Sequence, residues 1–413
     1  MLEIQKEYLC RVCKGELVDR VNFGEIYPSA FVENHDGLTK APLILASCVE
    51  CNLVQLRHTV SLDSMYRQYW YRSGLNPSMR NDLKDIANSI IEKVTILPGD
   101  IIVDIGCNDG TLFNFFPDYS FKIGFDPAKN LERLVGKNCD RFFNEYFPHK
   151  KFMIKAKVIT SIAMFYDLPD PMSFISAIKD MLTNDGIWVI QLTDLFSMLR
   201  INAFDNICFE HLEYYTLSNL ISMLSEFDLE IFDLEYNKVN GGSLRVYVSH
   251  PSAYPYNREI VKYLITEANY LNSDDDFLSS FINRIFEIGK SLVTELQSQH
   301  EVSSIFVLGA STKGNTLLQL FSIDNTIIDY AAEINEEKFG LRTVGSNIEI
   351  ISEEKALEMN PDFLLCLPWA FKETFLNKKH IREYMQNGGS LIFPLPYLHI
   401  CTMQNDEIIE ERL

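Results

Sequence analysis

Short apolar segments alternate with stretches of helical character along much of the chain, and this alternation limits its fold more than any other feature. Parallel strands need a long crossover between them, and the helical stretches supply one. The pattern therefore predicts a parallel, doubly wound sheet with helices on both faces. We expect its strands at residues 101–106, 121–126, 157–165 and 186–192.

A second series of strands and helices begins at residue 303 with SSIFVLGA. Residues 252–300 before it have a mainly helical pattern, and the length of 413 residues suits two or three domains. We expect four parts, which are a loop-rich N-terminal module (1–63), a first α/β core (64–250), a helical connector (251–300) and a second α/β domain (301–413).

The net charge of −20 has the wrong sign for binding a nucleic-acid backbone. The first residues, MLEIQKEYLC, lack the basic-then-apolar pattern of a secretory signal, and no apolar run reaches the length of a membrane span. We therefore expect a cytoplasmic protein with neither a nucleic-acid nor a membrane partner. Its oligomeric state cannot be predicted from these features.

Four of the nine cysteines form two pairs with the spacing of zinc knuckles, Cys10-x2-Cys13 and Cys48-x2-Cys51. Each pair can place two thiolates on one turn, so four sulfurs can surround one Zn²⁺ ion. Four thiolates close the coordination shell and leave no water to activate, which favours a structural ion. A nucleic-acid-binding ribbon is the alternative, and the lack of basic residues around the knuckles opposes it.

The segment VDIGCNDGTLF is expected to form a ligand-binding turn between a strand and a helix. Asp104 ends the strand, and Gly106 and Gly110 let the backbone approach a ligand closely. Asp126 ends the next strand, where a carboxylate can accept hydrogen bonds from ribose hydroxyls. This pattern resembles class I S-adenosylmethionine methyltransferases, whereas a dinucleotide enzyme would need G-x-G-x-x-G. An ordinary tight turn is the simpler alternative.

Together with the knuckles, the motifs YRSGLNPSM, DIGCNDGTL, FEHLEYY, NGGSLRVYV and GASTKGNTLL resemble the sugar C-methyltransferase family over almost the whole chain. Members methylate C3 of nucleotide-linked 4-keto deoxysugars. The resemblance implies an α/β protein with a zinc-binding N-terminal lobe, a Rossmann-like class I methyltransferase core and a second Rossmann-like domain that helps to hold the nucleotide sugar. The residues it implies for S-adenosylmethionine are Tyr71, Ser73, Asp104, Gly106, Asn108, Asp109, Gly110 and Asp126.

Carbon methylation next to a ketone needs a base, and the resemblance implies His211, the last residue of Phe209-Glu210-His211. Glu210 is expected to orient its imidazole. Both residues could instead simply tie a loop to the core. Two departures from the family alter this site: Cys208-Phe209 replaces a Tyr-His pair, and Asp167 stands where an active-site histidine is expected, which makes Asp167 a rival base.

GASTKGNTLL follows a strand, so its amides and Lys313 would lie at a helix N-terminus suited to a diphosphate. A glycine-rich turn with a solvated lysine is the alternative. Arg245 on a strand is another candidate contact, although such an arginine is more often a surface residue. The residues expected to bind substrate are Tyr214, Arg245, Ser311, Lys313 and Asn315.

The sequence thus predicts C-methylation of a nucleotide-linked keto sugar through an enolate, with S-adenosylmethionine and Zn²⁺ as cofactors. Two alternatives stay open. The chain could be an O-methyltransferase, which needs no enolate, or a catalytically silent binding protein that keeps the cofactor fold.

Overall fold

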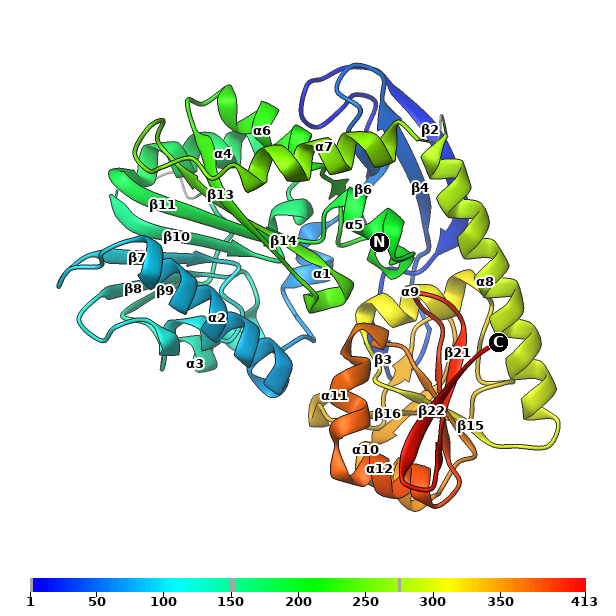
Figure 1. The fold of residues 1–413 in the computed structure, drawn as a ribbon. Helices are drawn as coiled ribbons and strands as arrows, with labels where there is room; N and C mark the ends of the chain where they lie inside the picture. The colour runs from blue at the N-terminus through cyan, green and yellow to red at the C-terminus, as the bar shows by residue number, and fades with distance from the viewer. Residues whose placement is uncertain (1–2, 149–153, 274–275) are drawn as a thin grey trace.

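The computed structural model describes residues 3–148, 154–273 and 276–413. Two α/β units lie beside each other, and the long helix α8 (Phe277–His300) runs along the second of them (Figure 1). The N-terminal strands pack near both units. This arrangement agrees with the α/β fold class expected from the sequence.

The first unit contains a seven-stranded sheet in which five parallel strands occupy the doubly wound order 3-2-1-4-5. Of the strands in this sheet, β14 comes last along the chain, and it lies antiparallel between β11 and β13. An all-parallel dinucleotide fold has no such reversed strand. In sheet order the strands are β9 (Arg141–Phe143), β8 (Phe121–Phe125), β7 (Ile101–Ile105), β10 (Ala156–Ile162), β11 (Leu182–Leu192), β14 (Ser243–Ser249) and β13 (Glu230–Asn237).

Most helices around this sheet begin at a residue whose side chain caps the first turn. The Asn76 side chain accepts a hydrogen bond from the Ser78 amide at the start of α2, with Pro77 in the first turn. Thr216 and Asn219 form a reciprocal capping box at the start of α6. The helices are α2 (Pro77–Lys93), α3 (Glu132–Val135), α4 (Pro171–Met181), α5 (Leu195–Arg200), α6 (Leu217–Ser225) and α7 (Glu259–Leu271).

The second unit is a nine-stranded sheet whose parallel part again has the order 3-2-1-4-5, beginning with β15 in the chain. Its sheet order is β22 (Glu407–Arg412), β21 (His399–Gln404), β20 (Ser390–Phe393), β19 (Phe363–Cys366), β15 (Ile305–Leu308), β16 (Tyr330–Glu333), β18 (Glu349–Ser352), β17 (Arg342–Thr343) and β3 (Phe31–Val32). Its helices are α9 (Thr312–Leu320), α10 (Glu353–Glu358), α11 (Lys372–Asn377) and α12 (Lys379–Gln386).

The N-terminal module has more regular structure than its sequence suggests. Instead of being loop-rich, it is built on an antiparallel sheet with a strand of 10 residues and one of 8 residues. The strand order is β12 (Glu213–Tyr214), β5 (Val54–Leu56), β4 (Ala41–Cys48) and β2 (Leu17–Ile26), and a separate pair joins β1 (Ile4–Lys6) to β6 (His58–Val60).

Two strand exchanges join the module to the rest of the chain. β12 comes from the first α/β unit but pairs with β5 of the module, while β3 comes from the module but pairs with β17 of the second unit. Gln319 on α9 completes the second connection, because its side chain exchanges two hydrogen bonds with the backbone of Tyr27. The module therefore links the two α/β units.

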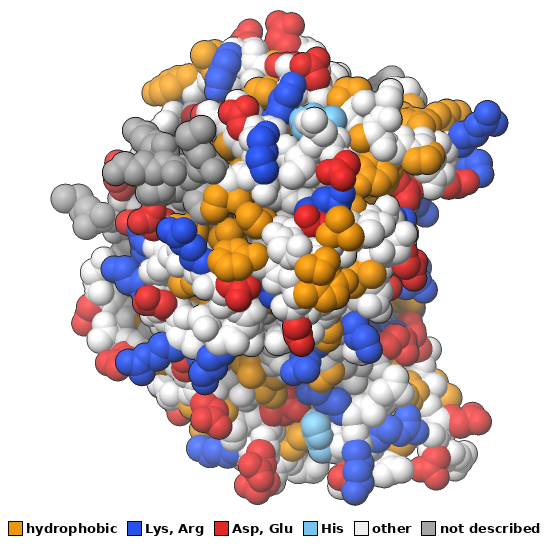
Figure 2. Space-filling model, turned by 90° about the vertical axis from the view of Figure 1, so that its left-hand side faces the viewer, with side chains coloured by type: hydrophobic (Ala, Val, Ile, Leu, Met, Phe, Trp, Pro, Cys, Tyr) orange, Lys and Arg blue, Asp and Glu red, His pale blue; other side chains and the backbone are white. Residues whose placement is uncertain are grey.

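Within the described residues, no helix is long and apolar enough to cross a membrane. The face shown in Figure 2 carries Lys and Arg side chains interspersed with Asp and Glu, and no single basic patch dominates it.

Candidate active site

A cavity of about 340 Å³ lies between the two α/β units. Its lining includes the turns after β7 and β8, the segment after β10, the start of α9 and residues 367–371 after β19. In each unit the first and fourth parallel strands are neighbours, so their crossovers leave in opposite directions and open a crevice. The cavity thus lies where the crevices of two doubly wound sheets face each other.

One half of the cavity is built on the glycine turn after β7. Gly106 and Gly110 have φ values of 73° and 75°, a left-handed conformation that suits glycine. The Asp126 carboxylate fixes the turn by accepting hydrogen bonds from the amides of Asn108 and Ala128, both at 2.9 Å. The segment that follows is a short 3-10 helix, η2 (Thr111–Phe115), and not the α-helix expected from the sequence.

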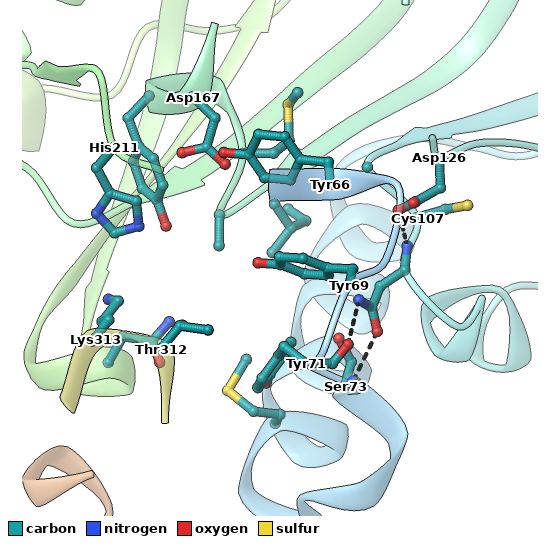
Figure 3. A pocket seen from close by; sticks show the side chains of 18 of the residues that line it. Tyr66, Tyr69, Tyr71, Ser73, Cys107, Asp126, Asp167, His211, Thr312 and Lys313 are labelled. Carbon is teal, nitrogen blue, oxygen red and sulfur yellow. Dashed lines mark hydrogen bonds between the residues drawn. The ribbon is translucent and has the colours of Figure 1, made fainter. Parts of the chain in front are cut away.

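Three hydrogen bonds fasten the YRSG segment to this turn, and those that reach Tyr71 and Ser73 are drawn in Figure 3. The Asn108 side chain donates to the Tyr71 carbonyl oxygen at 3.0 Å and accepts from the Ser73 amide at 2.9 Å. Asp109 accepts from the Gly74 amide at 2.8 Å. The cavity lining therefore includes Tyr71, Ser73 and Asn108. Asp109 does not line the cavity, and its contact with Gly74 holds the YRSG segment in place.

Two buried carboxyl groups give this half its electrostatic character. Burial raises the pKa of Asp104 to about 7, although Thr160 donates a 2.6 Å hydrogen bond to its carboxylate. Burial also raises the pKa of Asp126 to about 6. Among the described residues that line the cavity, Lys313 is the only lysine or arginine, and it belongs to the other half. The half built on the glycine turn thus suits a cationic ligand better than a pyrophosphate.

His211 lies in the other half of the cavity with a defined tautomer. Its Nδ1 is 2.9 Å from the carbonyl oxygen of Asn206, and a carbonyl can only accept, so Nδ1 carries the proton. Nε2 is consequently the unprotonated nitrogen. The ring packs on Tyr166 with centroids 4.2 Å apart. Burial and the positive charge of Lys313 hold the pKa of His211 well below its usual value, so the imidazole is neutral near pH 7.

The expected role of Glu210 in orienting His211 is wrong in this structure, because the backbone of Asn206 performs it. Glu210 is buried but does not line the cavity. Phe209, the other departure from the family motif at this point, is buried in the hydrophobic core.

Asp167 lines the cavity near His211 and ends the 3-10 helix η4 (Phe165–Asp167) (Figure 3). Its Oδ1 is buried without a hydrogen-bond partner among the described residues. Burial, with the nearby Glu210 carboxyl group, raises the pKa of Asp167 well above its usual range. Both effects favour the protonated form of the Asp167 carboxyl group.

The N-terminus of α9 faces the cavity from the second α/β unit. Ser311 caps the helix by accepting a 3.0 Å hydrogen bond from the Gly314 amide. Lys313 donates through Nζ to the Asn206 side-chain oxygen at 2.6 Å. Asn206 thus contacts both His211 and Lys313. It ends the 3-10 helix η5 (Phe204–Asn206), and sequence reasoning missed it because a lone asparagine carries no recognisable motif.

Three residues expected to bind substrate do not line the cavity. Arg245 is 1% exposed, not on the surface, and its guanidinium contacts Gln191, Glu235, Asp82 and Asp85. Asn315 is buried and donates to the Ala30 carbonyl oxygen. Tyr214 lies on β12 and donates to Asn206 at 3.4 Å. Each side chain is committed to contacts within the fold.

The four knuckle cysteines converge on one point of the N-terminal module, with all sulfurs within 4.8 Å of one another. Sγ atoms of Cys10 and Cys51 are 3.6 Å apart, and those of Cys13 and Cys48 are 3.3 Å apart. Zn–S bonds of about 2.3 Å in a tetrahedron require sulfurs about 3.8 Å apart. The cluster therefore fits the geometry of a four-thiolate zinc ion.

Two family descriptions match the chain: a methyltransferase domain over residues 78–234 and a C-methyltransferase C-terminal domain over residues 238–396. The C-methyltransferase NovU of Streptomyces niveus is 24% identical over 410 residues, which cover 96% of this chain and 97% of that protein.

Solved structures that are similar in part include magnesium protoporphyrin IX methyltransferase from Synechocystis PCC 6803. That protein is 11% identical, with 41% of this chain and 79% of that chain covered and a TM-score of 0.33. A S-adenosylmethionine-dependent methyltransferase from Clostridium acetobutylicum is 12% identical, with 41% and 92% covered and a TM-score of 0.34.

The two adjoining family matches and the relative of nearly equal length agree with the motifs in the sequence. The chain thus combines a methyltransferase domain with a C-methyltransferase C-terminal domain, and it is an S-adenosylmethionine-dependent methyltransferase.

Proposed function

We propose that the protein transfers a methyl group from S-adenosylmethionine to the carbon next to a ketone in a nucleotide-linked keto sugar. The observation that supports this proposal most directly is the tautomer of His211. Its Nδ1–H donates to a backbone carbonyl oxygen, so its free Nε2 can accept a proton in a cavity shared with the glycine turn. A low pKa keeps the imidazole ready to act as a base near pH 7.

In this mechanism, Nε2 of His211 removes the proton from the carbon beside the ketone. The electrons of the C–H bond form a carbon–carbon double bond, and the carbonyl oxygen becomes an enolate. The enolate carbon would then take the methyl group while the methyl–sulfur bond breaks and its electron pair stays on sulfur, and the enolate returns to the ketone. Bound S-adenosylmethionine supplies the electrophilic methyl group, while Asp104, Asp126, Asn108, Tyr71 and Ser73 are proposed to hold it.

We propose further that Cys10, Cys13, Cys48 and Cys51 bind one structural Zn²⁺ ion. The Gly15 amide lies 3.4 Å from the Cys13 sulfur, and the Glu50 amide lies 3.4 Å from the Cys48 sulfur. Such amide contacts stabilise thiolates in a metal site. With all four positions occupied by sulfur, the ion would take no part in the chemistry.

The test is incubation of the purified protein with methyl-labelled S-adenosylmethionine and a panel of nucleotide-linked 4-keto sugars, followed by NMR of the product. Label on the carbon beside the ketone supports the proposal. Label on oxygen would instead make the enzyme an O-methyltransferase, and absence of labelled product with every sugar would contradict both. In deuterated solvent, only the enolate route incorporates deuterium at the acceptor carbon before transfer.

A further inference from the structure

Buried acids lie in and around the half of the cavity that contains His211. Asp205 is 9% exposed and Glu210, just outside the lining, is 8% exposed. Asp167 is half-buried with a buried Oδ1, and burial raises the pKa of all three carboxyl groups. Cys208 adds another group whose pKa burial raises. An anionic oxygen that formed here would meet carboxyl groups and low-dielectric walls, so it needs a compensating cation.

Lys313 is the only lysine or arginine among the described residues that line the cavity. Figure 3 shows it across from Asp167 and on the same side of the cavity as His211. Its charge acts on the pKa of Asp167, Asp205, Cys208, Glu210 and His211, so it is the shared electrostatic neighbour of the group.

Asn206 fixes the relation between this cation and the base. Its side-chain oxygen accepts from Lys313 Nζ at 2.6 Å, and its backbone oxygen accepts from His211 Nδ1 at 2.9 Å. One residue therefore holds both groups at the same end of the cavity. An ammonium group has three protons, so two remain for a ligand after the bond to Asn206.

We propose that Lys313 is a catalytic residue that stabilises the substrate's carbonyl oxygen as it becomes the enolate, and not a binding group for the diphosphate. The inference rests on the proposed C-methylation. While His211 Nε2 takes the proton, negative charge develops on the carbonyl oxygen of the substrate. The ammonium group of Lys313 is already held in position by Asn206, so it stabilises this charge without having to move. No bond to Lys313 forms or breaks.

The same arrangement gives Lys313 a second, measurable effect. Its charge lowers the pKa of His211, so removal of the charge raises that pKa and moves the acidic limb of the rate profile to higher pH. The other titratable groups around His211 come from several elements. Tyr166 of η4 packs on its ring, and Tyr214 of β12 donates to the same Asn206 carbonyl oxygen as Nδ1. Asp167, Asp205 and Cys208 line the same cavity.

The experiment measures solvent deuterium exchange into a dTDP-linked 4-keto-6-deoxysugar, without methyl transfer, for wild type, Lys313→Met and Lys313→Arg. At saturating sugar we expect Lys313→Met to slow exchange about 10²–10³-fold and Lys313→Arg to recover part of the rate. Lys379→Met, at an exposed lysine of α12, is the matched control and should exchange at the wild-type rate.

Binding of dTDP and of S-adenosylmethionine by calorimetry separates the alternatives. We expect both affinities of Lys313→Met to stay within about threefold of wild type, a change well below 1 kcal/mol.

Loss of dTDP affinity with normal exchange would assign Lys313 to the diphosphate and overturn the inference. Loss of S-adenosylmethionine affinity as well would reduce the role of Lys313 to folding. Exchange by the wild type with no effect of Lys313→Met would overturn only the inference, whereas no exchange by the wild type with any 4-keto sugar would overturn the proposed function and the inference with it.

Discussion

The guanidinium Nε of Arg11 lies 3.4 Å from the carboxylate Oε1 of Glu213, and both side chains are almost wholly buried. Arg11 sits between two knuckle cysteines, and Glu213 is two residues after His211. The Arg11 amide also donates to the Gln55 side chain, and Gln55 is the register partner of Glu213. The cysteine cluster is thereby attached to the segment that carries the proposed base.

Arg11→Met should lower the free energy of unfolding by about 3 kcal/mol, because it leaves Glu213 buried without its cation. Turnover should fall too, since β12 would no longer hold the His211 segment. Denaturant unfolding and steady-state rates measure both effects. Arg342→Met removes a half-exposed ion pair with Glu349 and should change stability by less than about 1 kcal/mol. Equal losses of unfolding free energy in the two variants would mean that the buried Arg11–Glu213 pair stabilises the fold no more than an exposed ion pair does.

The protein should contain one zinc ion per chain, and Cys48→Ser should lose it. Metal-binding energy in such a module is folding energy, so the N-terminal sheet of the variant should become protease-sensitive before the rest. Elemental analysis and limited proteolysis measure these outcomes. Cys139→Ser, which alters a half-buried thiol outside the cluster, should keep its zinc. Full zinc content in Cys48→Ser would count against the four-cysteine site.

Asp126→Ala should weaken S-adenosylmethionine binding by about 1.5–3 kcal/mol, the expected loss when hydrogen bonds to a charged group disappear. Part of the loss would come from the turn, because Asp126 also accepts from the Asn108 amide. Calorimetry on Asp126→Ala gives the affinity, with Asp228→Ala as an exposed control. Unchanged affinity in Asp126→Ala would remove Asp126 from the cofactor site.

Binding of S-adenosylmethionine should strengthen as the pH rises from about 5.5 to 7.5. Burial raises the pKa values of Asp126 and Asp104 to about 6 and about 7, so both lose their protons in this window and become anions facing a cationic ligand. Calorimetry across this range measures the effect, and Asp104→Asn should flatten it. A pH-independent affinity in the wild type would contradict the assignment.

The same two groups should act on the stability of the ligand-free protein in the opposite direction. Their pKa values are higher in the folded than in the unfolded chain, where aspartates titrate near pH 4, so the native state holds more protons between about pH 4 and 7. Their contribution to the free energy of unfolding is therefore present at low pH and is lost as the pH rises through their folded pKa values. Denaturant unfolding with and without ligand separates the two trends.

Local sequence patterns predicted the features of the fold that depend on neighbouring residues. Alternating apolar segments predicted the two parallel sheets, and the turn at Gly106 and Gly110 was predicted from residues that lie together in the chain. Partnership between distant segments has no such local pattern. The pairing of Phe31 with Thr343 and of Glu213 with Gln55 therefore emerged only from the structure.

Arg245 shows why single residues in the site were harder to predict. A strand arginine is usually exposed, but Glu235 on the adjacent strand β13 and Asp82 from α2 both contact its guanidinium group. Asp82 is 163 residues away in the sequence, so no local pattern predicts this contact. Asn206 presents the same difficulty, because its importance comes from contacts with His211 and Lys313. Motifs identified the family's segments, whereas tertiary contacts decide which side chains reach the cavity.

His211→Ala should lower turnover by roughly 10²–10⁴-fold, the usual contribution of a positioned general base, with cofactor affinity near normal. The pKa of His211 is held well below 6.5 by burial and by Lys313, so the wild-type rate should fall only at a pH below that value, where Nε2 becomes protonated. Steady-state kinetics from pH 5 to 8 measure the profile. Glu210→Gln should have a smaller effect, because Glu210 does not line the cavity.

Asp167 is the matched rival, since it lines the same cavity and has a buried oxygen without a partner among the described residues. A base must be deprotonated, yet burial and the nearby Glu210 carboxyl group raise the pKa of Asp167 and favour its protonated form, which suits a hydrogen-bond donor better than a proton acceptor. Asp167→Asn preserves a donor at that position and should therefore reduce turnover less than His211→Ala. If Asp167→Asn abolishes deuterium exchange while His211→Ala retains it, Asp167 is the base, and the departure from the family motif marks a changed mechanism.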